Sequence, residues 1–172
     1  MTLQGLRVLI AEDETLIRLD LRQMLEEHGI DVCGEARDGL EAVELARETQ
    51  PDLAIFDLKM PNLDGVEAAR RVYAERPLPI IMLTAYSDRK TVERAVDAGV
   101  FSYLSKPFGP QDIIPAIRAA VARHADLLTA RREVGKREEP IEVEVKSSSG
   151  HVWPLRVQRK PDGSISVDVL PE

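Results

Sequence analysis

The sequence contains a single cysteine, Cys33, in 172 residues. One cysteine cannot form a disulfide within the chain, so we expect the fold to depend on its hydrophobic core. We expect Cys33 itself to be a small buried residue on a strand. The N-terminus also lacks a charged segment followed by an apolar one, the pattern of a secretory leader. These features predict a cytoplasmic protein.

Long hydrophobic runs and excess positive charge are also missing. The longest apolar runs are far shorter than the ~20 residues that cross a bilayer, so no membrane contact is expected. The formal net charge of -7 and the pI near 5.1 exclude a general attraction to nucleic acid phosphates. A content of 44% hydrophobic and 31% charged residues is typical of a globular protein. The length fits one full domain with a short additional segment.

Short apolar runs alternate with amphipathic stretches along the first two thirds of the chain. Helical spacing predicts inward-facing residues that include Leu16 and Leu21 in the first helix and Leu40 and Val43 in the second. Strands that alternate with helices predict a parallel sheet with helices on both faces, which is a doubly wound α/β fold. The strands are predicted over 7–11, 30–34, 53–56, 79–83 and 100–104, and the helices over 15–28, 40–48, 65–75, 87–98 and from 111 onward.

The last predicted helix continues beyond the length that covering the sheet requires. Its apolar positions follow steps of three and four, the pattern of a coiled-coil seam. We therefore predict three parts: a domain over residues 1–124, a helical extension and linker over 125–140, and a short β-rich segment over 141–172. The positions of the seam are Ile114, Ile117, Val121, His124 and Leu128.

The C-terminal segment alternates apolar and polar residues with a period of two. Turn signals at 147–150 and 160–163 divide it into three strands, which predicts a small β-meander. About thirty residues are too few to build a core of their own. The meander is therefore expected to rest on the rest of the chain, on a second copy of itself or on a partner.

Acidic and polar residues follow the predicted strands at their carboxyl ends. Glu12 and Asp13 follow the first strand, Asp57 the third, Thr84 the fourth and Lys106 the fifth. In an open α/β sheet these ends form one edge, where ligands bind. Either Asp57 or Thr84, taken alone, could simply cap the next helix. Together, the acids form an oxygen-only site that favours Mg²⁺ over a dedicated Ca²⁺ site.

A carboxylate beside Mg²⁺ is a competent nucleophile toward phosphorus, and the product at Asp57 would be an aspartyl phosphate. Thr84 can donate a hydrogen bond to the phosphoryl group, and Lys106 can supply a positive charge. Positioning and neutralisation of charge are most of what phosphoryl transfer requires.

Four motifs in order resemble the receiver domain of two-component response regulators, over roughly residues 5 to 122. The resemblance implies a flavodoxin-like sheet with the strand order 2-1-3-4-5. The motifs are Glu12-Asp13-Glu14, Phe56-Asp57-Leu58-Lys59-Met60-Pro61-Asn62-Leu63-Asp64-Gly65, Leu83-Thr84-Ala85 and Lys106-Pro107-Phe108.

The resemblance also implies the chemistry of the site. Asp57 is then the residue that accepts a phosphoryl group from a sensor histidine kinase. Mg²⁺ is held by Glu12, Asp13 and Asp57 together with the backbone carbonyl of Lys59. The protein would not be an enzyme in the usual sense, because it promotes only its own phosphorylation and dephosphorylation.

A conformational switch is the second implication of the resemblance. Thr84 and Lys106 contact the phosphoryl group, Thr84 and Tyr103 rearrange on phosphorylation, and the Lys106-Pro107 peptide bond is cis. The new charge would then shift a two-state equilibrium in the face formed by the helix at 87–98, the strand at 100–104 and the last helix.

The output of this switch has two candidate forms. The motifs resemble most the antiterminator regulators, which carry a small RNA-binding helical domain after the receiver. Here no three-helix segment follows residue 131, and the tail over 141–172 holds four basic and five acidic residues, which is no electrostatic footprint for RNA. The first form is control of dimerisation or partner binding through the last helix or the C-terminal strands. The second is a nucleic-acid-binding regulator of RNA antitermination or transcription.

Overall fold

The computed structural model describes residues 3–85, 100–136, 141–146, 152–159 and 165–169. The chain divides into two compact units, residues 1–125 and 126–172. Among the described residues, none of the helices combines the length and apolar character that crossing a bilayer requires.

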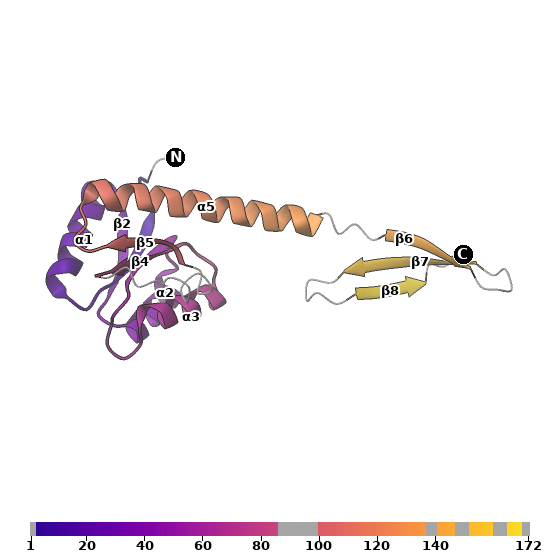
Figure 1. Cartoon of the computed structure of the whole chain (residues 1–172), viewed down its shortest axis with the longest axis horizontal. Helices are drawn as coiled ribbons and strands as arrows, with labels where there is room; N and C mark the ends of the chain where they lie inside the picture. Colours follow the sequence, from indigo (N-terminus) through magenta and orange to yellow (C-terminus); the bar gives the residue numbers. More distant parts are fainter. Residues whose placement is uncertain (1–2, 86–99, 137–140, 147–151, 160–164, 170–172) are drawn as a thin grey trace. The chain divides into compact units, whose positions relative to one another are not determined.

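The first unit contains a five-stranded sheet in which every neighbouring pair is parallel. The strand order is β2-β1-β3-β4-β5, as the family resemblance implied, and helices lie on both sides of the sheet (Figure 1). The strands are β1 (Arg7–Ala11), β2 (Asp31–Ala36), β3 (Leu53–Asp57), β4 (Ile80–Thr84) and β5 (Val100–Ser105).

Four helices lie within the described residues: α1 (Thr15–Glu27), α2 (Gly39–Thr49), α3 (Gly65–Glu75) and α5 (Pro110–Lys136). The helix predicted over residues 87–98 falls outside the part of the chain that the structure describes. The doubly wound α/β prediction is confirmed, because strands and helices alternate as expected and parallel strands require such crossovers.

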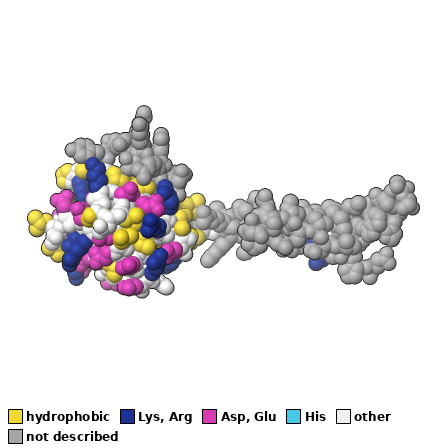
Figure 2. Space-filling model, turned by 90° about the horizontal axis from the view of Figure 1, so that it is seen from below, with side chains coloured by type: hydrophobic (Ala, Val, Ile, Leu, Met, Phe, Trp, Pro, Cys, Tyr) yellow, Lys and Arg dark blue, Asp and Glu magenta, His cyan; other side chains and the backbone are white. Residues whose placement is uncertain are grey.

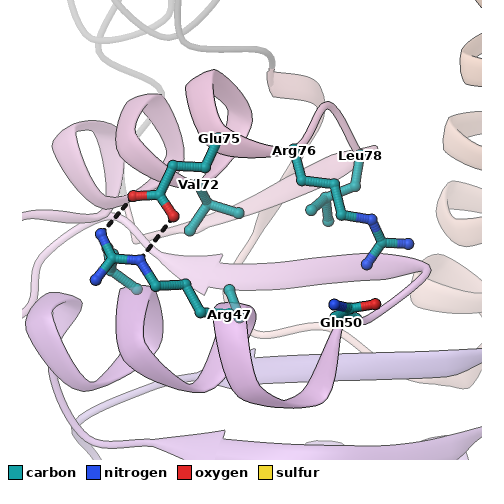
Figure 3. A pocket seen from close by; sticks show the side chains of 8 residues that line it. Arg47, Gln50, Val72, Glu75, Arg76 and Leu78 are labelled. Atoms are coloured by element: carbon teal, nitrogen blue, oxygen red, sulfur yellow. Dashed lines mark hydrogen bonds and ion pairs between the residues drawn. The ribbon is translucent and has the colours of Figure 1, made fainter.

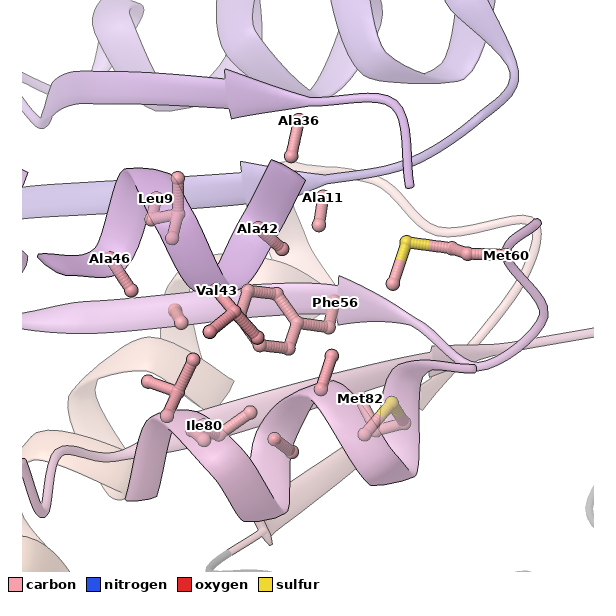
Figure 4. Close-up of a cluster of buried hydrophobic side chains, with 14 of the residues drawn as sticks. Leu9, Ala11, Ala36, Ala42, Val43, Ala46, Phe56, Met60, Ile80 and Met82 are labelled. Carbon is pink, nitrogen blue, oxygen red and sulfur yellow. The ribbon is translucent and has the colours of Figure 1, made fainter. Parts of the chain in front are cut away.

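Successive residues of each strand point to opposite faces of the sheet, and this alternation produces two separate cores. Leu9, Phe56 and Met82 pack with α2 and α3 on one face (Figure 4). Ile55 and Leu83, from the same strands, pack with α1 and α5 on the other. Both faces of the central strands are therefore shielded from solvent. This explains why β1, β3 and β4 consist mainly of consecutive apolar residues.

Two leucines predicted to face inward are instead exposed, so these predictions were wrong. Leu16 is 82% exposed and Leu40 is 46% exposed. The buried side of α1 contains Leu21 and Leu25 together with Arg18, a charged residue that hydrophobic spacing cannot detect. Leu16 is two residues from Arg18, which places it about 200° around the helix and away from the sheet.

Among the described side chains of helix α5, those buried against the sheet come from its first half. Ile113 and Ile117 are buried there, and the ring of His124 meets Phe101 edge-on at 5.4 Å between ring centroids. Leu127 and Leu128 are 47% and 39% exposed. The helix thus continues past the contacts that cover the sheet, as its length in the sequence indicated.

The second unit contains a three-stranded antiparallel sheet in the order β6-β7-β8. Its strands are β6 (Ile141–Lys146), β7 (Val152–Arg159) and β8 (Ile165–Val169). In its register Val143 pairs with Leu155, which in turn pairs with Val169. The predicted meander is therefore present, and its apolar positions lie in register across all three strands.

Charged residues of both signs are interspersed on the face of the first unit drawn in Figure 2. Ion pairs join some of the charged residues of this unit, such as Arg22 with Glu26 and Glu35 and Arg70 with Glu67. Such exposed pairs each contribute little to stability. On this face the described surface therefore offers no large patch of one charge.

Candidate functional site

Three acidic residues meet at the carboxyl ends of β1 and β3. Glu12 and Asp13 follow β1 directly, and Asp57 is the last residue of β3. One carboxylate oxygen from each lies within 4.8 Å of the others. Glu12 and Asp57 are buried, whereas Asp13 is exposed. Parallel pairing of β1 with β3 thus joins residues that are far apart in the sequence into one acidic pocket.

Lys106 lies between the two buried acids. Its Nζ atom is 2.6 Å from Oε2 of Glu12 and 3.0 Å from Oδ1 of Asp57. The side chain is 14% exposed, so the ammonium group reaches solvent only slightly. Two buried carboxylates next to each other are unfavourable without a cation, and Lys106 provides that charge.

The electrostatics of the pocket follow from burial and from this ion pair. Burial raises the pKa of Asp57; Lys106 opposes that shift, and the charge of Asp13 adds to it. Burial also raises the pKa of Glu12. For Lys106, burial lowers the pKa, but the hydrogen bonds and charges of Glu12 and Asp57 outweigh it and raise the pKa overall. The ammonium group therefore stays charged at neutral pH. Additional positive charge in the pocket would stabilise the ionised forms of Glu12 and Asp57.

Thr84 and Tyr103 lie on the two strands next to β3. Thr84 is the last residue of β4, is buried, and accepts the backbone N–H of Lys106 at 2.8 Å through its carbonyl. Tyr103 pairs with Met82 in register and packs against the core beside α2 and α3, and burial raises the pKa of its hydroxyl. The Lys106-Pro107 peptide bond is cis, as expected.

The loop that follows Asp57 is tightly closed. Its first residue, Leu58, donates its N–H to the carbonyl of Leu83 at 2.9 Å, and its carbonyl accepts the N–H of Gly65 at 3.0 Å. Lys59 lies in this loop, two residues beyond Asp57, with its side chain exposed. Asp64 then caps α3 by accepting the N–H of Glu67 at 2.8 Å. We refer to residues 58–64 as the acceptor loop.

Residues that hydrogen-bond to the loops of the pocket were not predicted from the sequence. Arg18 donates from Nη1 to the backbone carbonyl of Glu12 at 2.6 Å. Asp38 caps α2 and also accepts a hydrogen bond from Asn62 in the acceptor loop at 2.8 Å. An Asp-Gly pair before a helix was a signal for the cap, but no local pattern indicates the contact with Asn62.

A groove of about 340 Å³ lies between the C-terminal ends of α2 and α3 (Figure 3). Its apolar floor includes Val72 and Leu78, and on its rim Nε of Arg47 donates to Glu75 at 2.6 Å. Leu78 precedes β4, so the groove belongs to the edge of the sheet where the strands begin. The acidic pocket is at the opposite edge, and the groove is not part of it.

The acidic pocket lies in a part of the chain that matches a known protein family. Residues 8–118 match the model of the response regulator receiver domain. The chain belongs to this family. The match includes all four motifs and each strand of the five-stranded sheet, so the receiver domain is the part of the chain that carries the pocket.

Relatives of the receiver domain include curated proteins and solved structures. Transcriptional regulatory protein PdtaR of Mycobacterium tuberculosis is 48% identical over 158 residues, which is 91% of this chain and 77% of that protein. The crystal structure of the receiver domain of a modulated diguanylate cyclase from Desulfovibrio desulfuricans G20 is 39% identical, with a TM-score of 0.65, and the match covers 69% of this chain and 95% of that one. The receiver domain of the response regulator NarL from Mycobacterium tuberculosis is 29% identical, with a TM-score of 0.66, over 69% of this chain and 98% of that one.

Proposed function

We propose that this response regulator accepts a phosphoryl group on Asp57 from a sensor histidine kinase, in a reaction that depends on Mg²⁺. The observation that carries the proposal is the pocket of Glu12, Asp13 and Asp57 with the Nζ atom of Lys106 3.0 Å from Asp57. It combines a nucleophile, ligands for a hard cation and a fixed positive charge. We propose that this phosphoryl transfer takes place in the cytoplasm.

The donor set of the pocket fits Mg²⁺. Its three carboxylates offer only oxygen atoms, and their count leaves room for water and phosphoryl oxygen, which this ion prefers to a full set of protein ligands. Glu12, Asp13, Asp57 and the backbone carbonyl of Lys59 would hold it. When bound, the ion would neutralise charge on the acids and on the phosphoryl oxygens.

In the proposed transfer, a carboxylate oxygen of Asp57 forms a bond to phosphorus as the bond from phosphorus to the kinase's histidine nitrogen breaks. The electron pair of the broken bond returns to that nitrogen. Lys106 is placed to stabilise the negative charge of the phosphoryl oxygens, and the Thr84 hydroxyl to donate a hydrogen bond to them. The chain would act as a catalyst only toward its own phosphorylation and dephosphorylation.

The phosphorylated pocket would differ from the free one in charge and in hydrogen bonding. Thr84 ends β4, and Tyr103 lies on the adjacent strand. A shift of Thr84 toward the phosphoryl group would make room for Tyr103 to turn inward, and this change would alter the surface near β5. Charge-assisted hydrogen bonds can supply the few kcal/mol that such a change of population needs, on the order of 5 kcal/mol for a complete switch.

Removal of divalent metal should abolish phosphorylation. With acetyl phosphate as donor and Mg²⁺ present, the intact protein should gain the mass of one phosphoryl group. With EDTA in place of Mg²⁺ it should gain none, because the buried acids and the incoming phosphoryl oxygens would repel each other. Mass spectrometry of the intact protein provides the measurement, and equal incorporation in both conditions would contradict the metal assignment.

We propose that the output is control of dimerisation or partner binding by the far half of α5 or by the C-terminal strands. Exposed Leu127 and Leu128 support this proposal, since they continue the apolar spacing of the helix beyond the sheet. Nucleic acid binding is the second candidate. It is supported by the likeness to Transcriptional regulatory protein PdtaR, which extends over 91% of this chain and thus beyond the receiver match.

Sedimentation equilibrium can separate these outputs. With acetyl phosphate and Mg²⁺ the wild-type chain should double its mass, whereas the variant Leu128→Ser should remain monomeric because its apolar contact is lost. An unchanged mass for the wild type would contradict phosphorylation-controlled dimerisation. Binding of an RNA or DNA probe with a steep dependence on salt concentration would instead support the second candidate.

A further inference from the structure

The two loops that bear the acidic pocket are connected by a short segment outside it, residues 36–38. At one end of this segment, the carbonyl of Ala36 accepts the backbone N–H of Glu12 at 3.1 Å. At the other end, Oδ2 of Asp38 accepts a hydrogen bond from Nδ2 of Asn62, in the acceptor loop, at 2.8 Å. The segment therefore holds the loop of Glu12 and Asp13 with its backbone and the acceptor loop with a side chain.

Both oxygens of the Asp38 carboxylate have a partner. Oδ1 accepts the N–H of Glu41 at 2.9 Å and so caps α2, while Oδ2 accepts from Asn62. These hydrogen bonds hold the pKa of Asp38 below its ordinary value, and the bond from Glu41 has the larger effect. The carboxylate is charged at neutral pH. A capping residue needs only one oxygen for its helix. The second oxygen serves the acceptor loop.

Asn62 occupies an uncommon backbone conformation. Its φ is +65°, and the N–H of Leu63 bonds to the carbonyl of Pro61 at 2.7 Å across it, which defines a tight three-residue turn. A turn of this kind with positive φ is rare and strained, and asparagine is one of the few residues that tolerate it. Such conformations persist where the surrounding structure holds them. The bond to Asp38 is one such restraint.

The acceptor loop is also seated closely on the start of α2. A Cβ atom at Gly39 would lie 2.2 Å from the carbonyl oxygen of Leu63, so only glycine fits there. Met60 is buried in the core beside α2, and Leu63 packs against the same core. The contact between the loop and α2 is therefore a fitted surface in which the Asp38–Asn62 bond is the polar link.

We propose that Asp38 and Asn62 act as a clamp that sets the distance between the two loops of the metal site, and thereby the affinity of the pocket for Mg²⁺. This inference rests on the proposed function. Both are positioning residues, because neither belongs to the proposed ligands. Loss of the clamp would leave all ligands in the chain but allow the acceptor loop, with Lys59, to move relative to Glu12, Asp13 and Asp57.

Two variants remove the clamp without removing any of the proposed metal ligands. Asn62→Gly removes the side chain but keeps a residue that adopts positive φ freely. Asp38→Ser keeps a capping oxygen for Glu41 but lacks the second oxygen. Arg47→Ala is the matched control: it removes the donor to Glu75 at 2.6 Å, a polar link between α2 and α3 at their C-terminal ends, and leaves the clamp intact.

Isothermal titration calorimetry of the full chain with Mg²⁺ alone gives a readout that is independent of phosphorylation. Each clamp variant should bind Mg²⁺ about fivefold more weakly than the wild type, the factor expected from the loss of one hydrogen bond. The double variant should be no weaker than either single one, since both remove the same contact. Arg47→Ala should bind as the wild type does. Phosphorylation of the clamp variants should recover when Mg²⁺ is raised to saturation.

The outcomes separate this inference from the proposed function. Equal affinity for Mg²⁺ in the wild type and in both clamp variants would overturn the clamp and leave the proposed function standing. Additive losses in the double variant would also overturn it, because two independent effects would then be at work. A wild-type chain that binds no Mg²⁺ would overturn the proposed function and the clamp together.

Discussion

Asp57→Asn should lower phosphoryl incorporation from acetyl phosphate by more than about a thousandfold, the scale on which removal of a nucleophile acts. The amide lacks the negative oxygen that must attack phosphorus, and it removes one of the three acids that would hold Mg²⁺. The variant should still fold, because the amide replaces a buried charge that lies beside two other acids. Incorporation is measured as the gain of mass of the intact protein, and stability as the midpoint of thermal unfolding.

The matched control is Asp52→Asn. Asp52 precedes the same strand at its other end, is exposed, and accepts the N–H of Arg7 at 3.0 Å. This variant should incorporate phosphoryl groups at the wild-type rate. Wild-type incorporation by Asp57→Asn, or peptide mapping that locates the phosphoryl group on Asp13, would refute the site assignment.

Gly65→Ala should lower the free energy of unfolding by about 3 kcal/mol, at the upper end of the usual effect of overpacking. A Cβ atom at Gly65 would lie 2.0 Å from the backbone carbonyl oxygen of Asp57, which cannot move without displacing Asp57 in the acidic pocket. Within a helix, alanine is normally favoured over glycine by about 1 kcal/mol, so the sign of the change shows which effect dominates. Urea denaturation measures this free energy, and phosphorylation should slow in parallel.

Gly109→Ala provides the comparison for this substitution. There the atoms nearest to a Cβ atom would be those of the amide end of the Gln111 side chain, at 2.6 Å, and a flexible side chain can turn away. We expect a change of less than about 0.5 kcal/mol, as for other surface substitutions. An equal effect of both substitutions would show that the close contact at Asp57 is not what requires glycine at position 65.

The arrangement of the sheet and most of the pocket could be predicted from the sequence because both depend on short-range patterns. Apolar runs separated by helical spacing require parallel strands, and parallel strands bring their carboxyl ends to one edge. Glu12, Asp57 and Thr84 follow such runs directly, so their meeting at that edge is a consequence of topology. The strand order and the cis bond before Pro107 followed from the family resemblance, and both are confirmed.

The wrong predictions that Leu16 and Leu40 face inward have a common physical cause. Hydrophobic spacing identifies apolar residues on a helix but not which side of the helix meets the sheet. In α1 the buried side includes Arg18, whose charge is satisfied by the carbonyl of Glu12, and Leu16 is left in solvent. In α2 the buried side is formed by Gly39, Ala42, Val43 and Ala46, and Leu40 lies outside it. A buried charge of this kind depends on its partner, and the partner belongs to another element.

The sequence by itself therefore determined the doubly wound fold, the edge at which the acids gather and the presence of Asp57 among them, because each follows from local pattern and from chain topology. Only the tertiary structure decided that Lys106 lies between Glu12 and Asp57, and that Asp38 holds Asn62, a residue 24 positions away. These contacts depend on distances of a few ångströms between separate elements. Such distances are set by how helices and loops pack on the sheet, and no periodicity in the chain encodes them.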